Sequence, residues 1–275
     1  MKIAYSNLAC PEWSMEEVFA KAVQFGFDAV EIRLVDGEVI PSELSADVER
    51  RIVTLSKESG VDIVGIGAST KFASHDEADR QRNVEDLLRY VELAARMEVP
   101  MVRTFGGTFA ADHLDARQAV AYVADALAQV APRAEALGVA VLLETHDDFS
   151  HSALVRDVVS QVGSPAIGAL WDTHHPYRMG ETVEETFDNL QAGLRHVHLK
   201  DARRAGDGWE LVVFDEGEVP VRDIVRTLVD HGYNGAFCIE WERKWHPEIE
   251  AAETALPKHL SILRNYLASA EQKER

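Results

Sequence analysis

Cysteine is scarce in this chain of 275 residues, which contains Cys10 and Cys238 and no others. Both lie in apolar or strand-like sequence, and they do not form the paired spacing of a zinc knuckle. A disulfide framework is typical of short secreted chains with several cysteines. The sequence therefore supports neither a disulfide framework nor a zinc knuckle.

Positive charge is also in short supply. The chain has 28 Lys and Arg against 47 Asp and Glu, which gives a net charge of −19 at pH 7. No local basic patch interrupts this acidic composition, and a negative surface repels phosphate backbones. The sequence therefore argues against a nucleic-acid partner.

Long apolar runs are missing as well, so we expect no membrane partner. The first residues, Met1 to Tyr5, are followed at once by the polar Ser6 and Asn7, which is not the pattern of a secretory signal peptide. We therefore expect a cytoplasmic protein. Hydrophobic residues make up 46% of the chain and charged residues 27%, which are ordinary values for a folded globular protein and argue against disorder.

The sequence does contain a regular alternation of strand-like and helix-like segments. Strands are expected at residues 2–6, 29–33, 61–66, 101–105, 139–144, 166–172, 195–201 and 236–240. Helices are expected at 14–26, 45–59, 77–97, 116–137, 154–162, 182–190, 221–231 and 248–268. A kink or local break is expected at Pro132, and a hairpin around residues 209–214.

This alternation predicts an α/β protein, specifically a (β/α)₈ TIM barrel that forms a single domain over residues 1–275. Eight strand–helix units in a chain of this length fit a closed barrel better than an open doubly wound sheet. Open sheets often carry a glycine-rich phosphate turn after the first strand. No such turn follows residues 2–6, and no linker or low-complexity segment divides the chain.

Polar side chains follow the later predicted strands at the points where those strands end. The segments are Glu144-Thr145-His146, Asp172-Thr173-His174-His175, His198-Leu199-Lys200-Asp201 and Glu240-Trp241-Glu242. In a parallel barrel the C-terminal strand ends surround the active site. The period of two places His196, His198 and Lys200 on one face of their strand and Val197 and Leu199 on the other. These groups are therefore expected at the barrel mouth.

Four of these residues, Glu144, Asp172, His198 and Glu240, would bring three carboxylates and one imidazole together. Carboxylates packed this closely are forced toward protonation unless a cation lies between them. We therefore predict a site for one divalent metal ion. The oxygen-rich donor set favours Mn²⁺, our first expectation, and also suits Mg²⁺ or Co²⁺, with Zn²⁺ possible.

Three residues near these motifs, His196, Trp241 and Glu242, have two interpretations each. His196, one layer below His198, is either a core residue or a support for the site. Asp201 is expected to be a structural anchor. Trp241 either lines the place of a sugar ring or packs the barrel rim, and Glu242 either reaches the site or lies in a surface loop.

At the strand-end motifs the chain resembles the xylose-isomerase-like barrel superfamily, in particular its sugar isomerase and epimerase branch. The resemblance covers nearly the whole chain, including Gly26-Phe27-Asp28-Ala29-Val30-Glu31-Ile32. It implies that Glu144, Asp172, His198 and Glu240 are the ligands of one divalent metal ion. It also implies that Glu144 and Glu240 serve as the acid/base pair and that His175 contacts the substrate.

The chain is also similar to metal-dependent 3-dehydroshikimate dehydratases of this superfamily. In those enzymes the positions matching Arg103, His146 and Lys200 line the substrate site, which implies a binding role for Arg103 and catalytic roles for His146 and Lys200. DNA endonucleases of the superfamily use extra histidines at the third and fourth strand ends. Residues 65–69 and 103–107 contain none, so an endonuclease is not expected.

We therefore expect a metal-dependent isomerase or epimerase of a small sugar or keto-polyol, which removes a proton beside a carbonyl through a metal-bound enediolate. If a β-hydroxyl leaves with help from His146 or Lys200, the enzyme is instead a dehydratase of a keto-polyol such as 3-dehydroshikimate or an inosose. A sugar-binding barrel with a structural metal is the non-enzymatic alternative. A homodimer is expected because such barrels often form one.

Overall fold

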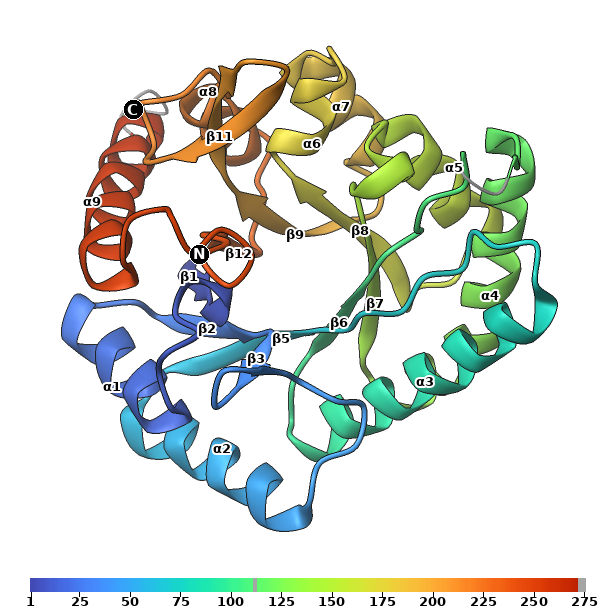
Figure 1. The fold of residues 1–275 in the computed structure, drawn as a ribbon, viewed down its shortest axis with the longest axis horizontal. Coiled ribbons are helices and arrows are strands. Elements are labelled where there is room, and N and C mark those ends of the chain that lie inside the picture. The colour runs from blue at the N-terminus through green and yellow to red at the C-terminus, as the bar shows by residue number, and fades with distance from the viewer. Residues whose placement is uncertain (111–112, 272–275) are drawn as a thin grey trace.

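The computed structural model, which describes residues 1–110 and 113–271, is a closed barrel of eight parallel strands surrounded by helices (Figure 1). Around the barrel the strands follow the order β1, β12, β9, β8, β7, β6, β5 and β2. Their bounds are β1 Lys2–Ser6, β2 Ala29–Ile32, β5 Asp62–Gly67, β6 Met101–Thr104, β7 Ala140–Glu144, β8 Ile167–Asp172, β9 Leu194–Leu199 and β12 Ala236–Ile239. The predicted single-domain (β/α)₈ barrel is confirmed.

Apart from the short α6, which follows β8 at the C-terminal end of the barrel, the helices cover the outside of the barrel and bury their apolar faces against it. They are α1 Met15–Phe25, α2 Ala46–Ser59, α3 Glu77–Arg96, α4 Ala116–Leu137, α5 Ser152–Val162, α6 His174–Arg178, α7 Val183–Leu190, α8 Val221–Asp230 and α9 Ala252–Glu271. α1 begins with a capping box between Ser14 and Glu17 and ends at Gly26, which has the left-handed conformation that favours glycine. Within the described residues, no helix has the length and apolar character needed to cross a bilayer.

The local break that was one of the two expectations at Pro132 is wrong. α4 runs without interruption through Pro132, and a kink there stays a prediction. Proline removes the hydrogen bond that Ala128 would otherwise accept, and both residues lie on the exposed side of the helix. Water can hydrate the free carbonyl at that surface, so the helix continues.

Two hairpins extend the barrel at the C-terminal side of its strands. β3 Leu34–Val35 pairs with β4 Glu38–Val39 and was not expected from the sequence, whereas β10 Asp201–Ala205 pairs with β11 Gly208–Val212 close to the predicted hairpin. The predicted strand 195–201 ends at Leu199, because Asp201 already belongs to the second hairpin. The short helix α6 was not expected either.

The barrel interior has an apolar floor below a polar layer. Ala4, Ala29 and Cys238 form one small cluster inside the barrel, and Met101, Leu142 and Leu170 form another. Side chains alternate along a strand, so residues two positions further on point the same way. Those residues include Glu31, Glu144, Asp172 and Glu240. The fold therefore directs four carboxylates from four strands into one enclosed space.

Asp201 anchors the second hairpin, as the sequence predicted. Its buried carboxylate accepts backbone N–H bonds from Ala202 at 2.8 Å, Gly217 at 3.0 Å and Val219 at 3.1 Å. We expect Asp201→Asn to lower the free energy of unfolding by about 1–3 kcal/mol, because an amide cannot accept all three bonds. Urea denaturation measures this. Asp207→Asn, at the exposed hairpin tip, should change stability by less than about 0.5 kcal/mol, and equal losses in the two variants would contradict the anchor.

His259 is buried in α9 with neither ring nitrogen hydrogen-bonded among the described residues. It packs against Phe214 and Trp241, with ring centroids 4.2 and 5.1 Å away. Burial, together with the charge of Lys258, lowers the pKa of His259 to about 3.

Because the folded-state pKa of His259 lies below the unfolded value of about 6.5, protonation favours unfolding. Its contribution to stability is complete above about pH 6.5 and is lost as the pH falls from there toward pH 3. We expect His259→Phe to remove that part of the pH dependence, up to roughly 1.4 kcal/mol per pH unit. Denaturation curves of both proteins at pH 7, 6, 5 and 4 test this. Parallel stability profiles would show that His259 does not titrate on unfolding.

Candidate metal centre and active site

Four side chains converge at the C-terminal end of the barrel. Glu144 ends β7, Asp172 ends β8, His198 lies in β9, and Glu240 follows β12. All four are buried, and one ligand atom from each lies within 4.8 Å of the others. The strand register explains part of this, because Asp172 and Cys238 are both register partners of His198. The structure thus brings together the four residues predicted to bind metal.

His198 lies at the centre of the cluster. Its Nδ1 is 3.0 Å from Glu144 Oε1 and 3.3 Å from Glu240 Oε1, while its Nε2 is 2.9 Å from Glu31 Oε2. Burial alone would lower the pKa of His198, but the charges of Glu240, Glu31 and Glu144 outweigh it and raise that pKa well above its usual value. One imidazole therefore joins two groups of carboxylates.

Lys200 brings a second cation into the cluster. Its Nζ is 2.8 Å from Asp172 Oδ2, 2.6 Å from Glu240 Oε2 and 2.5 Å from Glu242 Oε1. Burial opposes the charge, yet the three carboxylates raise the pKa of Lys200 well above its ordinary value. Glu242 therefore reaches the site rather than pairing with Arg243, which bonds Glu12 instead.

The donor set fits a divalent metal ion. Among the described residues, Glu144 Oε2 and Glu240 Oε2 accept no hydrogen bond of good geometry, and they are approached only as ion pairs, by Arg103 Nε at 3.2 Å and by Lys200. Three carboxylates and one imidazole are the ligands that divalent ions such as Mn²⁺ prefer. Buried carboxylate oxygens that accept no hydrogen bond of good geometry are positions where a bound cation lowers the free energy.

Arg103, His146 and His175 stand beside the cluster. Arg103 donates from Nη1 to Ala68 O at 2.9 Å, and its guanidinium lies 4.0 Å from the Phe105 ring centroid. The His146 ring is 4.3 Å from the ring of His175, whose Nε2 is 3.6 Å from Asp172 Oδ2. These side chains form a polar wall next to the carboxylates.

The pKa values of His146 and His175 are shifted in opposite directions. Burial lowers the pKa of His146, but its contact with Asp147 and the charge of Glu144 outweigh this and raise it. Burial and the neighbouring cations hold the pKa of His175 well below its usual value, and neither of its ring nitrogens has a hydrogen-bond partner among the described residues. His146 can thus donate a proton, whereas neutral His175 can accept a hydrogen bond.

Trp241 has contacts away from the cluster. Its indole N–H donates to Glu250 O at 2.8 Å, and its ring packs against His259 of α9. The rim-packing interpretation accounts for these contacts, and a substrate contact of Trp241 stays a prediction.

Two buried charged residues near this site, Glu31 and Arg33, were not predicted from the sequence. Glu31 is fully buried and bonds both His196 and His198. Arg33 donates to Gly67 O at 3.1 Å and Ser69 Oγ at 2.8 Å, and burial with the nearby charge of Arg103 lowers its pKa to about 10. The sequence does contain a signal for Glu31, because it is the one charged residue inside the apolar run Ala29–Ile32.

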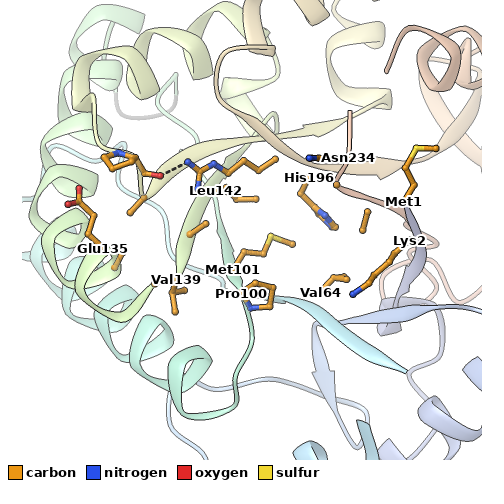
Figure 2. A pocket seen from close by; sticks show the side chains of 18 residues that line it. Met1, Lys2, Val64, Pro100, Met101, Glu135, Val139, Leu142, His196 and Asn234 are labelled. Atoms are coloured by element: carbon orange, nitrogen blue, oxygen red, sulfur yellow. Dashed lines mark hydrogen bonds between the residues drawn. The ribbon is translucent and has the colours of Figure 1, made fainter. Parts of the chain in front are cut away.

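A cavity of about 770 Å³ opens at the opposite end of the barrel (Figure 2). It is lined by the beginnings of strands, among them Lys2, Met101, Ala140 and Ala236, and by His196. None of the four predicted metal ligands lines it. Its walls are mainly apolar, and the four predicted metal ligands lie at the other end of the barrel.

Comparison with known proteins agrees with this barrel fold. Residues 19–266 match the family described as xylose isomerase-like TIM barrel. The chain belongs to this family. Among xylose isomerase-like barrels, fructoselysine 3-epimerase of Shigella flexneri is 24% identical over 237 residues, which cover 82% of this chain and 84% of that protein.

Two solved structures share the fold of this xylose isomerase-like barrel. The IolI protein, solved with a bound zinc atom, has a TM-score of 0.83 at 17% identity and covers 98% of this chain and 99% of its own. The probable 3-DHS dehydratase AsbF from Bacillus anthracis has a TM-score of 0.76 at 18% identity, with coverages of 96% and 99%.

The charge balance of this site predicts that Lys200 stabilises the metal-free protein. Lys200→Met would leave the carboxylates of Asp172, Glu240 and Glu242 without their ammonium partner. We expect a loss of roughly 3–5 kcal/mol in the free energy of unfolding, most of which Mn²⁺ recovers by supplying the missing charge. Thermal denaturation with EDTA and with Mn²⁺ measures both effects.

The matched control is Lys57→Met, which removes an exposed ion pair with Glu98 at 3.0 Å. It should change stability by at most about 1 kcal/mol, without dependence on metal. If Lys200→Met were as stable as wild type in EDTA, the proposed charge balance would be incorrect.

Proposed function

We propose that this protein is a divalent-metal-dependent isomerase or epimerase of a small sugar or keto-polyol. The observation that carries the proposal is the position of two carboxylates around one imidazole nitrogen. Glu144 and Glu240 both approach His198 Nδ1, at 3.0 and 3.3 Å, from strands that are separated by β8 and β9 around the barrel. A substrate held between them has a carboxylate on each side.

Glu144, Asp172, His198 and Glu240 would hold the ion. An ion held there would act as a Lewis acid and would stabilise the negative charge that develops beside the substrate carbonyl. We propose Mn²⁺ first, because most of the donors are carboxylate oxygens, with Mg²⁺, Co²⁺ or Zn²⁺ as alternatives.

The chain's own residues move the proton. One of the pair Glu144 and Glu240 takes a proton from the carbon beside the carbonyl, and the other returns one from the opposite face, which inverts that carbon. Arg103 and Lys200 balance the negative charge of the reacting group. Neutral His175, whose ring nitrogens have no hydrogen-bond partner among the described residues, orients the substrate by accepting a hydroxyl hydrogen bond at one nitrogen and donating its N–H from the other.

The similarity to fructoselysine 3-epimerase supports a sugar substrate and an epimerisation. The similarity extends over 82% of this chain and 84% of that protein. The cytoplasmic location and the homodimer stay predictions.

A dehydratase is the second candidate, because three cationic or proton-donating side chains stand beside the same carboxylates. The raised pKa of His146 suits a group that protonates a leaving hydroxyl, and Arg103 and Lys200 are placed to bind an acidic substrate. The shared fold with a probable 3-DHS dehydratase is compatible with this alternative. The first chemical step is the same in both reactions.

The experiment that tests the proposal is proton exchange in deuterated water. The Mn²⁺-loaded protein converts the sugars, the ion is removed, and NMR detects deuterium beside the carbonyl of ketoses, keto-polyols or 3-dehydroshikimate. We expect Glu144→Gln and Glu240→Gln each to slow exchange by about 10²–10⁴-fold. The control Glu248→Gln removes an exposed carboxylate and should exchange at the wild-type rate.

The products distinguish the two candidates. An epimer or isomer identifies the proposed activity, whereas an enone product, seen by its strong ultraviolet absorbance, identifies the dehydratase. Wild-type exchange in both glutamine variants would exclude the acid/base pair. A metal-loaded protein that binds a sugar tightly without any exchange would be a sugar-binding barrel rather than an enzyme.

A further inference from the structure

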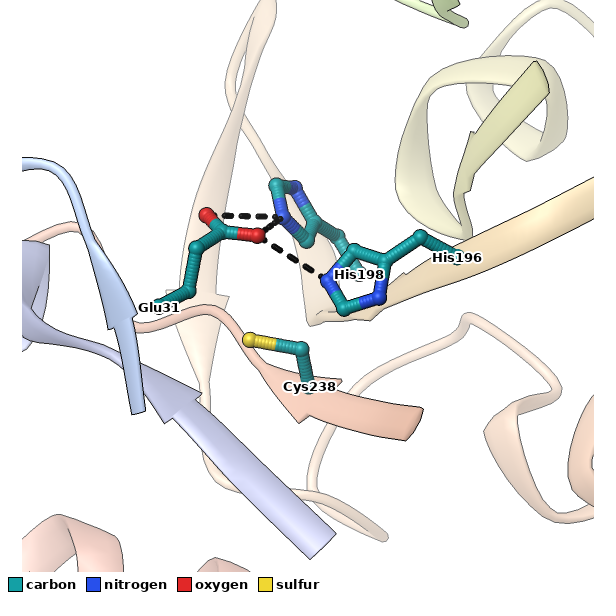
Figure 3. Close-up of side chains that lie close together, drawn as sticks. All are labelled: Glu31, His196, His198 and Cys238. Carbon is teal, nitrogen blue, oxygen red and sulfur yellow. Dashed lines mark hydrogen bonds and ion pairs between the residues drawn. The ribbon is translucent and has the colours of Figure 1, made fainter. Parts of the chain in front are cut away.

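A buried carboxylate, Glu31, lies beside the candidate metal ligands and has no part in the proposed reaction. Glu31 projects from β2 into the barrel interior with no exposed surface. Figure 3 shows it facing His196 and His198 of β9, with Cys238 of β12 beside them. A charged group at this depth is costly unless it is fully hydrogen-bonded.

His196 and His198 each form a hydrogen bond to Glu31 through the ring nitrogen Nε2. His196 Nε2 is 2.9 Å from Glu31 Oε2, and His198 Nε2 is 2.9 and 3.1 Å from Oε2 and Oε1. An ionised carboxylate only accepts hydrogen bonds, so each imidazole donates its Nε2–H. This bond keeps a proton on Nε2 of His198, so a metal ion that displaced the Nδ1 proton would bind at Nδ1, the nitrogen that faces Glu144 and Glu240.

We infer that Glu31 is a positioning residue that sets the tautomer and ring orientation of His198 for metal binding, and that His196 holds Glu31 in place. The inference rests on the metal site proposed above. Carboxylates that bond the distal nitrogen of a ligating histidine fix its orientation and strengthen its binding, and their loss typically weakens metal affinity by about 10–100-fold.

A second metal ion among Glu31, His196, His198 and Cys238 is the competing interpretation, because these donor types also suit zinc. The contacts favour the hydrogen-bond network. The nitrogen-to-oxygen distances of 2.9 Å are those of hydrogen bonds.

The decisive variant is Glu31→Gln, which keeps the size of the side chain. Its amide has one oxygen and one NH₂ group, so it cannot accept from both imidazoles in the present arrangement. The matched control is Cys238→Ala, which alters the same buried layer without touching either histidine bond. His196→Leu is the second test variant and keeps Glu31 itself.

The first readout is Zn²⁺ binding to each metal-free protein by isothermal titration calorimetry, which needs no substrate. We expect one ion per chain throughout, a Kd raised about 10–100-fold in Glu31→Gln, and a Kd raised at least about threefold in His196→Leu. Cys238→Ala should bind like wild type. Glu144→Gln, which removes a proposed direct ligand, should lose most of the binding.

The second readout reports the tautomer, which a general loss of stability would not change. In the Zn²⁺-loaded, ¹⁵N-histidine-labelled wild type, NMR should show His198 protonated at Nε2, with a downfield proton shift caused by the charged acceptor. In Glu31→Gln that downfield signal should be lost.

The inference would be overturned if Glu31→Gln bound Zn²⁺ with wild-type affinity and kept an unchanged Nε2–H signal of His198. The same two results in His196→Leu would also overturn it. Two zinc ions per wild-type chain, with one lost in Cys238→Ala, would make Glu31 a ligand instead. If wild type binds one ion and Glu31→Gln binds it equally well, only this inference fails. If wild type binds none, the proposed function fails with it.

Discussion

Buried carboxylates that need positively charged partners determine how the side chains are arranged at the centre of this molecule. Glu31, Glu144, Asp172 and Glu240 all point into the space enclosed by eight strands, where water cannot solvate them. His198, Lys200 and Arg103 are the partners that the strands place among them. Ionised carboxylates at such distances are compatible with folding only because these groups meet them, so the stability of the barrel and the chemistry of its mouth rest on the same contacts.

The closed barrel produces this convergence from simple alternation. Leu142, Leu170 and Cys238 each lie two residues before Glu144, Asp172 and Glu240, so an apolar floor and a polar layer follow from one repeated spacing. An open sheet with the same strands would spread these carboxylates along an edge. Closure places them around one point, where one cation can serve several of them.

Much of the fold was predictable from the sequence because its signals are local. Ser14 with Glu17 and the glycine at position 26 mark the ends of α1, and the apolar runs mark the strands. The four candidate ligands were also predictable, because polar groups directly after apolar strands are conspicuous. The hairpin of β3 and β4 was missed, since it consists of two-residue strands that are too short to show a period.

The missed contacts are those between distant segments. Glu31 contacts His196 and His198, which lie 165 and 167 positions further along the chain. The sequence pattern of neither segment indicates that the two segments are in contact. The partners of Lys200 and the packing of Trp241 on α9 also depend on how the strands are arranged in space. Such facts become visible only when the barrel is closed.

The pairing of the first strand with the last has a consequence for assembly. β1 and β12 lie side by side, with Lys2 opposite Ala236 and Tyr5 opposite Ile239, and Glu240 comes directly after that pairing. Both ends of the chain must therefore be in position before Glu240 can join Glu144, Asp172 and His198. A chain synthesised only as far as β9 lacks Glu240, so the four candidate ligands can come together only after β12 has closed the barrel.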